Sequence, residues 1–426
     1  MARTTLSMHH IARIEGHGNV RVAIEDGKVT DVQMNVVEPA RFFESMVAGR
    51  SYDKISYIAS RICGICSSSH VVTDLMAIEM AFGIQVSERT RLLRELLIYG
   101  SYLQNHAAHL FVFAAPDFVG EDSVFPLAEK NPELFQGGLA IKALGNELCT
   151  KVGGRSIHPI TAVVGGFTHE MSAEDYLEMA DKLAAMRPFC EKVVDVFASF
   201  QVPQLESEGD FIALREDGHY AVASGRPAFV SDKQEFDALD YREYVEEYPI
   251  RHSAAFFSRR KDTGATFAAS ALARINLSWN ELTQPARLAA AKAGLRPPVL
   301  NPYLNNVAQA VELVDVCVRC EAYLRELAKG EGSSAPVEFE VKAGRGVGIT
   351  EAPRGTLIHE VELDAEGRVV HASIITPTVH NLSDTENNVR KVAELLAAQG
   401  ADEATIRLEV EKLVRAYDPC LSCSVH

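Results

Sequence analysis

The stretch Asp418-Pro-Cys420-Leu-Ser-Cys423-Ser-Val-His426, at the end of the 426-residue chain, decides how the rest of the sequence is interpreted. It spaces two cysteines and a histidine as Cys-x2-Cys-x2-His. A chain end is normally the least ordered part of a domain, so metal ligands placed there need a second segment to hold them. The stretch Arg61-Ile-Cys63-Gly-Ile-Cys66-Ser-Ser-Ser-His70 offers another Cys-x2-Cys followed by a histidine. We therefore predict that four thiolates from opposite ends of the chain converge on one metal centre.

Composition narrows the class of protein. The chain is 47% hydrophobic and 23% charged with a net charge of −16, which argues against nucleic acid or an anionic membrane as partner. No apolar run approaches the roughly 18 residues that span a bilayer, and the sequence MARTTLSMHH lacks the apolar core of a secretory signal. Six of the eight cysteines fall in Cys-x2-Cys pairs, which predicts a cytoplasmic, metal-binding protein. Export in complex with a partner that carries the signal is the alternative.

Alternation of apolar and polar residues predicts a hairpin near each end of the chain. Residues 18–37 alternate on both sides of Glu25-Asp-Gly-Lys28, and residues 355–376 do so around Asp364-Ala-Glu-Gly367. Each hairpin is preceded by a short polar loop: Arg13-Ile-Glu15-Gly-His17 and Glu351-Ala-Pro-Arg354-Gly355. We therefore predict two similar β units, each presenting a charged loop.

The residues between the hairpins, and those after the second one, have a helical pattern. Helices are predicted at 71–82, 87–114, 172–200, 303–329, 384–399 and 402–416. Ser172 and Ser383 are expected to cap two of them, Pro188 to kink one, and Pro116 and Pro419 to end two others. The prediction is a mostly helical α+β fold in a single domain. Its parts are a β unit at 1–50, a helical body at 51–330 with a mixed insertion at about 205–280, a linker at 330–336, and a C-terminal β unit with the metal-closing segment at 337–426.

The other cysteines are expected in the core. Cys317 and Cys320 continue an apolar helical stripe, and buried cysteine behaves as a small hydrophobe. Cys149 and Cys190, isolated in helical stretches, are interpreted in the same way. The two pairs described first differ because each lies at a helix boundary with a histidine close behind. Their spacing leaves two alternatives open, a structural zinc site and a redox or catalytic metal.

Taken together, these segments resemble the large subunit of the [NiFe]-hydrogenases. The two cysteine segments are similar to that family's signature segments. Further matches are Arg13-Ile-Glu-Gly-His17, Phe43-Glu44, His158-Pro159, Gly165-Gly166 and Glu351-Ala-Pro-Arg-Gly355. Val164 stands where many respiratory members have proline, so the chain resembles the soluble cytoplasmic multimeric branch. The resemblance implies that family's fold, with a central helical bundle and peripheral β-hairpins, and reversible heterolytic cleavage of H2.

The resemblance also implies the cofactors. The nickel ligands would be Cys63, Cys66, Cys420 and Cys423. Cys66 and Cys423 would bridge to an iron that carries carbonyl and cyanide ligands. A further Mg2+ or Fe2+ would be bound by Glu44, His426 and a main-chain carbonyl near residue 374. In this family a maturation endopeptidase clips an extension after the terminal histidine, so the sequence is interpreted as the mature form.

Heterolytic cleavage of H2 needs a Lewis-acidic metal and a nearby base. By resemblance, Cys420 takes the proton first and Glu15 passes it outward, because burial can tune a glutamate toward neutral pH. Arg354 resembles the guanidinium over the open face of the metal centre, and Asp117 and Asp418 resemble the carboxylates that orient it. The alternatives are an exposed loop carboxylate for Glu15 and helix-end carboxylates for the two aspartates.

The sequence allows two roles for each of three histidines. His70 resembles a hydrogen-bond donor to a bridging sulfur, and a satisfied core histidine is the alternative. His106 and His109 lie three residues apart on a predicted helix and are interpreted as core packing or as part of a proton path rather than as ligands.

Electrons released at such a site need a partner, because no other cysteines are spaced for iron–sulfur clusters and no Gly-rich nucleotide fingerprint is present. The resemblance implies an iron–sulfur small subunit beside the active site and further electron-transfer subunits, such as a flavin/NAD, F420 or heterodisulfide module. Two alternatives stay open. One is the quinone-site subunit of respiratory complex I, which the four cysteines disfavour, and the other is a zinc-stapled interaction subunit.

Overall fold

The computed structural model describes residues 3–25 and 28–425. Its α-helices are α1 (Phe43–Val47), α2 (Tyr52–Ala59), α3 (Ser67–Phe82), α4 (Glu88–Ala107), α5 (Ala115–Val119), α6 (Phe125–Lys130), α7 (Pro132–Gly153), α8 (Ala173–Ala198), α9 (Ala271–Leu277), α10 (Gln284–Lys292), α11 (Asn305–Leu327), α12 (Pro377–Ala398) and α13 (Glu403–Ala416). Short helices of other types are η1 (Ser60–Ile62), the π-helical η2 (Ala108–Ala114), η3 (Ala238–Glu243), η4 (Trp279–Glu281), η5 (Pro302–Leu304) and η6 (Ser422–Val425).

The strands form small sheets at separate places in the chain. They are β1 (Arg3–Met8), β2 (Gly18–Glu25), β3 (Lys28–Val36), β4 (Ala162–Val163), β5 (Gly166–Phe167), β6 (Asp210–Arg215), β7 (Arg226–Phe229), β8 (Val245–Tyr248), β9 (Phe257–Arg260), β10 (Phe267–Ala268), β11 (Gly344–Ala352), β12 (Gly355–Leu363) and β13 (Val369–Ile375). Among the described residues, three sheets have three strands each, in the orders β1-β2-β3, β10-β6-β7 and β11-β12-β13, and two have two strands each.

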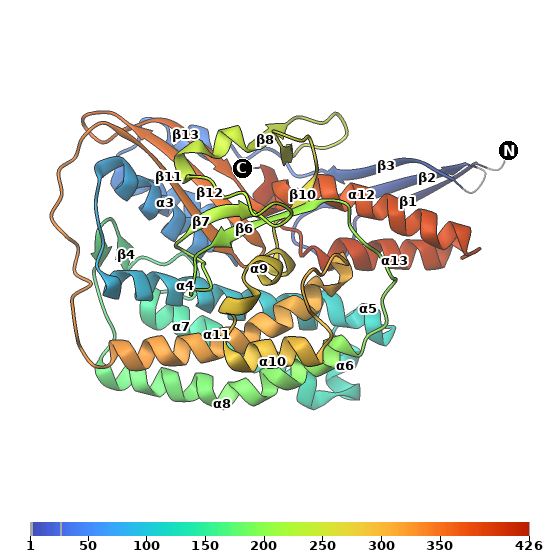
Figure 1. Cartoon of the computed structure of the whole chain (residues 1–426), viewed down its shortest axis with the longest axis horizontal. Coiled ribbons are helices and arrows are strands. Elements are labelled where there is room, and N and C mark those ends of the chain that lie inside the picture. The colour runs from blue at the N-terminus through green and yellow to red at the C-terminus, as the bar shows by residue number, and fades with distance from the viewer. Residues whose placement is uncertain (1–2, 26–27, 426) are drawn as a thin grey trace.

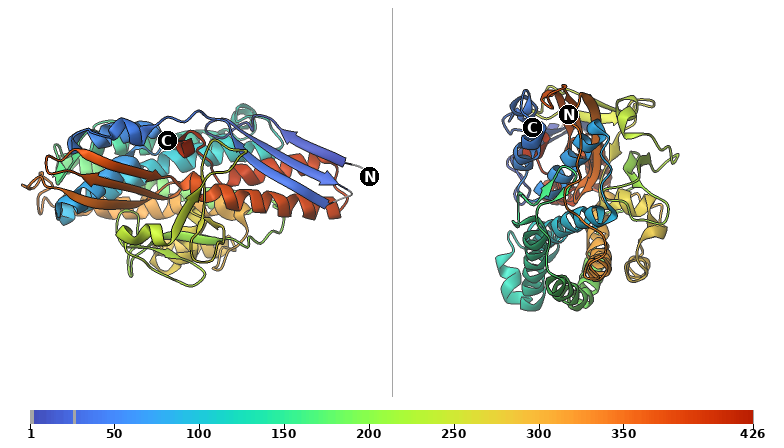
Figure 2. Two further views of the ribbon diagram at one scale, coloured as in Figure 1. Left: turned by 90° about the horizontal axis from the view of Figure 1, so that it is seen from above. Right: turned by 90° about the vertical axis from the view of Figure 1, so that its left-hand side faces the viewer.

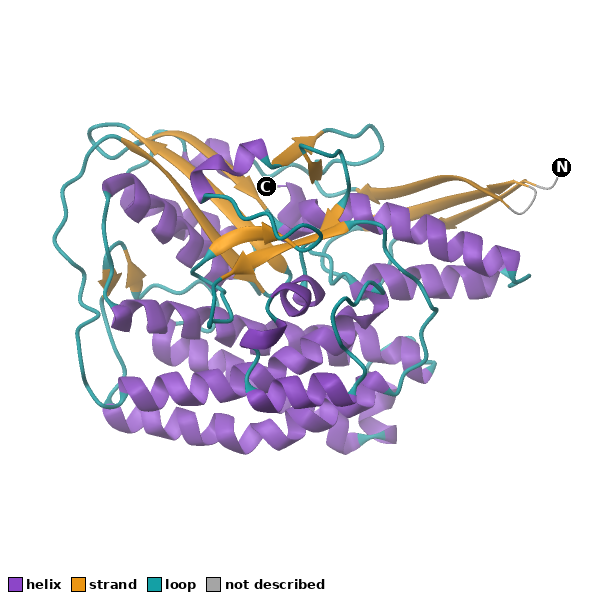
Figure 3. Cartoon of the chain, viewed as in Figure 1, coloured by secondary structure: helices purple, strands orange, loops and turns teal. Residues whose placement is uncertain are grey.

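Four of the long helices lie together, apart from the main sheets, whereas α3 and α12 pack against strands. In Figure 1 the helices α4, α7, α8 and α11 run along the longest axis in the lower half, and the β11–β13 sheet lies above them. Figure 3 shows the same division between helices and strands by colour. Seen from above, the β1–β3 and β11–β13 sheets extend toward opposite ends of the molecule, and the C-terminus lies between them (Figure 2). The chain therefore returns its last residues to the middle of the fold.

Both predicted hairpins are confirmed, and each gains a third strand. Strands β2 and β3 pair antiparallel, with Gly18 opposite Val36, while the turn residues 26–27 lie outside the described residues. Strands β12 and β13 pair with Ile358 opposite Ile375. Strand β1 joins the first hairpin through β2, and β11 joins the second through β12. Each hairpin was predicted with two strands.

Most predicted helices are confirmed, but α7 was not among the helices predicted, and other corrections concern where helices begin and end. Helix α8 begins after Ser172, whose hydroxyl accepts a hydrogen bond from Asp175 N at 3.1 Å, and it runs through Pro188. Helix α12 begins at Pro377 and not at residue 384, because Pro377 fits the first helical position, where its missing N–H is not needed. Ser383 therefore lies inside α12 and does not cap it. The same rule explains why α5 begins just before Pro116, where the sequence predicted a helix end.

Glycines on β11 allow α3 to lie directly against the C-terminal sheet. A Cβ on Gly346 would overlap the carbonyl oxygen of Ala77, and one on Gly348 would overlap that of Thr73. Side chains at these positions would push the helix away from the sheet. Because α3 begins at the residue after Cys66, this close contact fixes the helix that follows the first cysteine pair.

The predicted core cysteines are confirmed. Cys149, Cys190, Cys317 and Cys320 are all fully buried. The sulfur of Cys190 on α8 lies 3.8 Å from that of Cys317 on α11, within the packing of the two long helices. Within residues 3–25 and 28–425, no helix combines the length and the apolar character that a membrane span requires.

Candidate metal centre

Backbone contacts hold the C-terminal tail against the N-terminal part of the chain. Glu15 and Cys420 form a parallel β-bridge, and Leu421 N donates a hydrogen bond to the main-chain oxygen of Glu15 at 3.0 Å. Further along, Arg41 N donates to the main-chain oxygen of Val425 at 2.9 Å. The loop that carries Glu15 therefore holds the tail in place. It is a second segment of the kind that metal ligands at a chain end need.

Two threonines at the start of α12 support the tail from the other side. The hydroxyl oxygen of Thr378 accepts a hydrogen bond from Cys420 N at 3.0 Å. The Thr376 hydroxyl donates to the main-chain oxygen of Cys423 at 3.2 Å. Because α12 begins at Pro377, Thr376 directly precedes the helix and Thr378 lies on its first turn, and the earlier start of this helix places both against the second cysteine pair.

Arg41 connects the two cysteine segments, and sequence reasoning missed it. Its Nη2 donates to the main-chain oxygen of Ile62, next to Cys63, and to that of Ser422, next to Cys423, the latter at 2.6 Å. A single arginine before Phe43 carries no spacing signal, because the two carbonyl groups that it joins are 360 residues apart in the chain.

The structure brings the two cysteine pairs together. The sulfurs of Cys63, Cys66 and Cys423 all lie within 4.8 Å of one another, and those of Cys63 and Cys420 are 3.8 Å apart. All four residues are buried. Apolar side chains pack around them: Phe43, Ala59, Ile62 and Ile374. We call Cys63, Cys66, Cys420 and Cys423 the sulfur site.

Cys420 and Cys423 are joined by a disulfide in this structure, whereas the sequence predicts two thiolates. The tight turn between them places their Cα atoms 5.3 Å apart, which brings the two sulfurs together. A disulfide sulfur carries no negative charge. As thiolates, Cys420 and Cys423 would complete a set of four anionic, soft ligands for a metal.

The surroundings favour the thiolate form of Cys63, whereas the hydrogen bond with Cys63 and burial raise the pKa of Cys66. The Cys66 thiol hydrogen-bonds to the sulfur of Cys63 and lowers the pKa of Cys63 to about 7, and the positive charge of Arg354 acts in the same direction. Cys66 N also donates to that sulfur at 3.3 Å. A lowered pKa favours the thiolate, which is the form that binds metals.

Arg354 directs its charge toward the sulfur site. Its Nε donates to Asp418 Oδ1 at 3.0 Å, while its Nη1 and Nη2 are buried and have no hydrogen-bond partner among the described residues. Burial by itself lowers the pKa of Arg354, but the Asp418 carboxylate and the Cys63 sulfur raise it above its usual value. Buried donors normally have acceptors. The four sulfurs and the two unpartnered nitrogens of Arg354 therefore fit a soft metal whose other ligands accept hydrogen bonds.

Asp418 is fixed by side chains from two helices. Its Oδ2 accepts from Asn105 Nδ2 at 2.6 Å and from Gln309 Nε2 at 3.0 Å. Burial by itself raises the pKa of Asp418, but the Arg354 charge lowers it below its usual value, so the carboxylate stays ionised. The structure thus pairs Arg354 with Asp418, as the sequence predicted.

Asp117 does not pair with Arg354 here, and this expectation is corrected. One of its oxygens accepts from Arg13 and the other from Arg415 Nη1 at 2.7 Å. Arg415 also donates from Nε to the main-chain oxygen of Ala12 at 2.9 Å. Two nearer arginines satisfy both carboxylate oxygens, so Asp117 links the loop before Glu15 to α13.

Glu15 contacts the sulfur site directly. Its Oε2 lies 3.1 Å from the sulfur of Cys420 and accepts from Ser422 N at 3.1 Å. The Ser422 hydroxyl donates to the other oxygen. Glu15 is only partly buried, so its carboxylate lies between a buried sulfur and the surface.

The predicted second ion site is described only in part. Ile374 N donates to Glu44 Oε1 at 3.1 Å, so Glu44 lies beside the residue whose carbonyl was expected to share the ion. His426 lies outside the described residues.

The three histidines are buried within hydrogen-bonded chains. His70 Nδ1 lies 3.0 Å from His359 Nε2, whose other ring nitrogen is 2.6 Å from Asp74 Oδ1. His106 Nε2 lies 2.8 Å from Glu312 Oε2. His109 Nε2 lies 2.7 Å from the main-chain oxygen of Arg415. Ligation is therefore not needed to explain His106 or His109.

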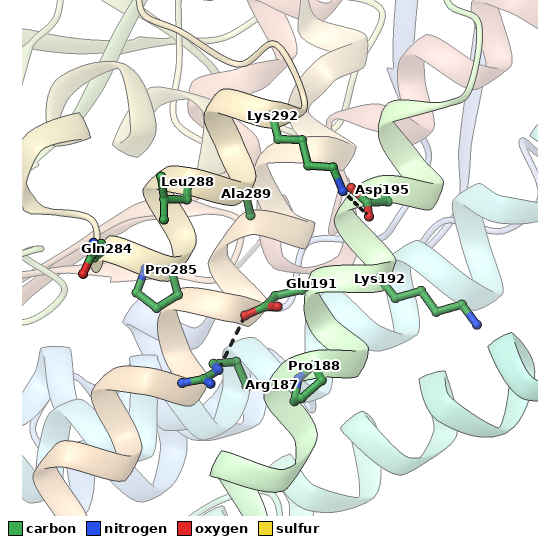
Figure 4. Close-up of a pocket in the computed structure, with 10 residues that line it drawn as sticks. All are labelled: Arg187, Pro188, Glu191, Lys192, Asp195, Gln284, Pro285, Leu288, Ala289 and Lys292. Atoms are coloured by element: carbon green, nitrogen blue, oxygen red, sulfur yellow. Dashed lines mark hydrogen bonds and ion pairs between the residues drawn. The ribbon is translucent and has the colours of Figure 1, made fainter.

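A surface hollow elsewhere on the molecule shares no residue with this site. It has a volume of about 650 Å³ and lies between α8 and α10 (Figure 4). Two ion pairs lie at its wall, between Arg187 and Glu191 and between Lys292 and Asp195. Its lining residues belong to these two helices, and none of them is a cysteine or a histidine.

Comparison with known proteins identifies relatives over almost the whole chain. The model of the nickel-dependent hydrogenase family matches residues 41–134 and 266–426, and a HoxL-like model matches residues 5–38. The chain is 35% identical to sulfhydrogenase 1 subunit alpha of Pyrococcus furiosus, covering 99% of this chain and 97% of that protein. It is 29% identical to the NAD-reducing hydrogenase HoxS subunit beta of Cupriavidus necator, covering 98% and 93% of the two chains. A crystal structure of an NAD+-reducing [NiFe]-hydrogenase in the H2-reduced state matches with a TM-score of 0.86 and 27% identity over 99% of both chains.

Proposed function

The chain belongs to the nickel-dependent hydrogenase family, and from this premise we propose that it is the catalytic subunit that cleaves H2 reversibly at a nickel–iron centre in the sulfur site. The convergence of four buried cysteine sulfurs beside a buried arginine with two unpartnered nitrogens carries this proposal. Cys63, Cys66, Cys420 and Cys423 would hold the nickel, and Cys66 and Cys423 would also hold an iron with carbonyl and cyanide ligands.

When bound, such a centre supplies the Lewis acidity and the redox capacity that heterolytic cleavage of H2 requires. The chain's own residues manage the proton. The thiolate of Cys420 accepts it and passes it to Glu15, whose Oε2 lies 3.1 Å away. The backbone N–H of Ser422 holds that carboxylate oxygen in place. Because Glu15 is only partly buried, it can release the proton outward.

Arg354 contributes a fixed positive charge. Its Nε is held by Asp418, so its two terminal nitrogens keep one orientation without reorganisation. These donors would hydrogen-bond a cyanide ligand and stabilise negative charge near the sulfurs. Glu44, with His426 and the carbonyl of residue 374, is proposed to hold the additional Mg2+ or Fe2+, which would tie the tail to the β11–β13 sheet.

We further propose an iron–sulfur small subunit as the electron acceptor, with additional electron-transfer subunits, in a cytoplasmic enzyme of the multimeric branch that is matured by an endopeptidase. The likeness to the alpha subunit of a sulfhydrogenase and to a subunit of an NAD-reducing hydrogenase supports partner subunits of this kind. In this proposal residues 1–426 act as one domain, and His70 helps to set the charge of a bridging sulfur.

The elements around the sulfur site offer a docking surface for the small subunit. Phe43 and Ala59 pack beside the sulfurs, while Phe42, Met46 and Tyr57 from the same segments are exposed by 64%, 43% and 46%. An exposed apolar surface formed by these side chains would suit a protein interface. Electrons leaving the sulfur site would cross this surface by a short route.

We expect the Phe42→Asp substitution to weaken small-subunit binding about 10- to 100-fold, because it places a charge in an apolar contact. Binding is measured by co-purification and by titration of the separated subunits. Leu288→Asp is the matched control, since Leu288 is 63% exposed but belongs to α10, which lies in the lower half of the molecule in Figure 1. Equal binding by the two variants would contradict the proposed surface.

The proposed function is tested on the purified complex by elemental analysis, infrared spectroscopy and H2-dependent dye reduction. Nickel and iron, metal-bound carbonyl and cyanide bands, and H2-dependent reduction are the expected result. Zinc without nickel would instead select the structural zinc alternative. A chain that is folded but holds neither metal would point to the relative of the complex I subunit.

A further inference from the structure

We propose that Arg274 is a positioning residue for Arg354, an inference that rests on the function proposed for the sulfur site. Arg274 lies on α9 and is 1% exposed. It contacts none of the four cysteines in the described contacts. Its role follows from what its guanidinium does to the turn between β11 and β12, from which Arg354 extends.

Arg274 binds the backbone on the N-terminal side of Arg354. Its Nη1 donates to the main-chain oxygen of Ala352 at 3.1 Å, and its Nη2 donates to that of Pro353 at 2.9 Å. On the C-terminal side, Gly355 has a φ of +132° and lies so close to Ala269 that a Cβ would come within 2.5 Å of its backbone. Arg274 on α9 and Ala269 just before this helix therefore fix the turn on both sides of Arg354.

The orientation of Arg274 is itself determined by two carboxylates. Its Nε and Nη2 donate to the two oxygens of Glu312 at 2.6 and 2.8 Å, and its Nη1 donates to Glu351 Oε2 at 3.1 Å. The Tyr102 ring lies under the guanidinium, 4.9 Å from its centre. All three guanidinium nitrogens are engaged, so the single ammonium of a lysine cannot reproduce the set of contacts.

One face of α11 controls both ends of Arg354. Gln309 donates to Asp418, which binds the Arg354 side chain. Glu312, one turn later on α11, binds Arg274, which holds the Arg354 backbone. Glu312 also accepts from the Tyr220 hydroxyl at 2.7 Å. A shift of Arg274 would therefore move the guanidinium of Arg354 relative to the sulfurs while leaving the four cysteines in place.

Arg260 provides a matched control for loss of a buried arginine. It is 3% exposed and is paired with Asp210, Asp232 and Asp262, as Arg274 is paired with glutamates. The described hydrogen bonds of its side chain go to these residues, Ser231 and Gln234, and none goes to the turn that carries Arg354. The Arg260→Lys variant therefore shows how the loss of a buried guanidinium by itself affects the infrared bands and turnover.

The test compares Arg274→Lys, Arg260→Lys, Arg354→Lys and the Arg274→Lys/Arg354→Lys double variant in the purified complex. We expect Arg274→Lys to keep its nickel and iron, to shift the infrared bands of the metal ligands as Arg354→Lys does, and to lower turnover about 10- to 100-fold. The double variant should be no slower than Arg354→Lys alone, because Arg274 acts through Arg354. Arg260→Lys should leave the infrared bands unchanged.

Two results would overturn the inference. One is that Arg274→Lys has the same infrared bands and turnover as Arg260→Lys. The other is that the fold loss of turnover in the double variant equals the product of the fold losses in the two single variants. If Arg274→Lys does not fold, the Glu351→Gln variant is used in its place. This substitution weakens one contact of Arg274 and should shift the same infrared bands by a smaller amount. Unshifted bands in Glu351→Gln would also overturn the inference. Nickel and turnover in the unmodified complex test the proposed function separately, so the two failures are distinguishable.

Discussion

Replacing Cys423 by serine is expected to abolish assembly of the metal centre. In the proposed arrangement this sulfur binds both nickel and iron, and it lies within 4.8 Å of the sulfurs of Cys63 and Cys66. A serine hydroxyl is a hard, neutral ligand and does not replace a soft thiolate. Since loss of residues that only support a ligand already costs about 10- to 100-fold in metal affinity, loss of a bridging ligand should cost more. Nickel content should fall to background, and H2-dependent dye reduction should disappear with it.

Cys320→Ser is the matched control for this prediction. Cys320 is also fully buried, but it lies in the apolar packing of α11, and its substitution should lower stability by about 1–3 kcal/mol while keeping nickel. Thermal unfolding separates the two effects. If Cys423→Ser retained nickel and normal turnover, the sulfur site could not be the place where H2 is cleaved.

Replacing Glu15 by glutamine is expected to slow turnover about 100- to 10,000-fold, the usual contribution of a positioned acid or base. Glutamine has nearly the same shape and keeps an oxygen that can accept from Ser422 N, so the loop should stay in place. It cannot take up and release a proton at this step. Nickel and iron content, measured together with dye reduction, should therefore remain unchanged while the rate falls.

Glu38→Gln tests whether any carboxylate near this loop would have the same effect. Glu38 accepts hydrogen bonds from the backbone and the ring of His17, two residues beyond Glu15, and none of its described contacts involves a cysteine. Its substitution should leave the rate close to that of the unmodified enzyme. A normal rate for Glu15→Gln would exclude Glu15 from the proton path, even with the metal site intact.

Local patterns in the sequence predicted much of this protein. The spacing of the cysteines, the two hairpins and the burial of Cys149, Cys190, Cys317 and Cys320 depend on periodicity and on side-chain chemistry. Each of these signals is contained within about 30 residues or fewer, the range over which helical and strand periods can be recognised. The ends of helices were predicted less accurately, because a proline can begin a helix as well as end one. Pro116 and Pro377 both lie in the first turn of a helix.

By itself, the sequence determined which residue types were available for metal binding and proton transfer, and where helices and strands would alternate along the chain. The tertiary structure alone decided which of those residues meet. It paired Asp117 with Arg13 and Arg415 instead of Arg354, and it placed Arg41 and Arg274 in supporting roles that no spacing indicates. The physical reason is that these contacts join segments that lie about 80 to 380 residues apart in the chain. The close packing of helices and sheets selects such partners, and the side-chain chemistry of one segment alone does not determine them.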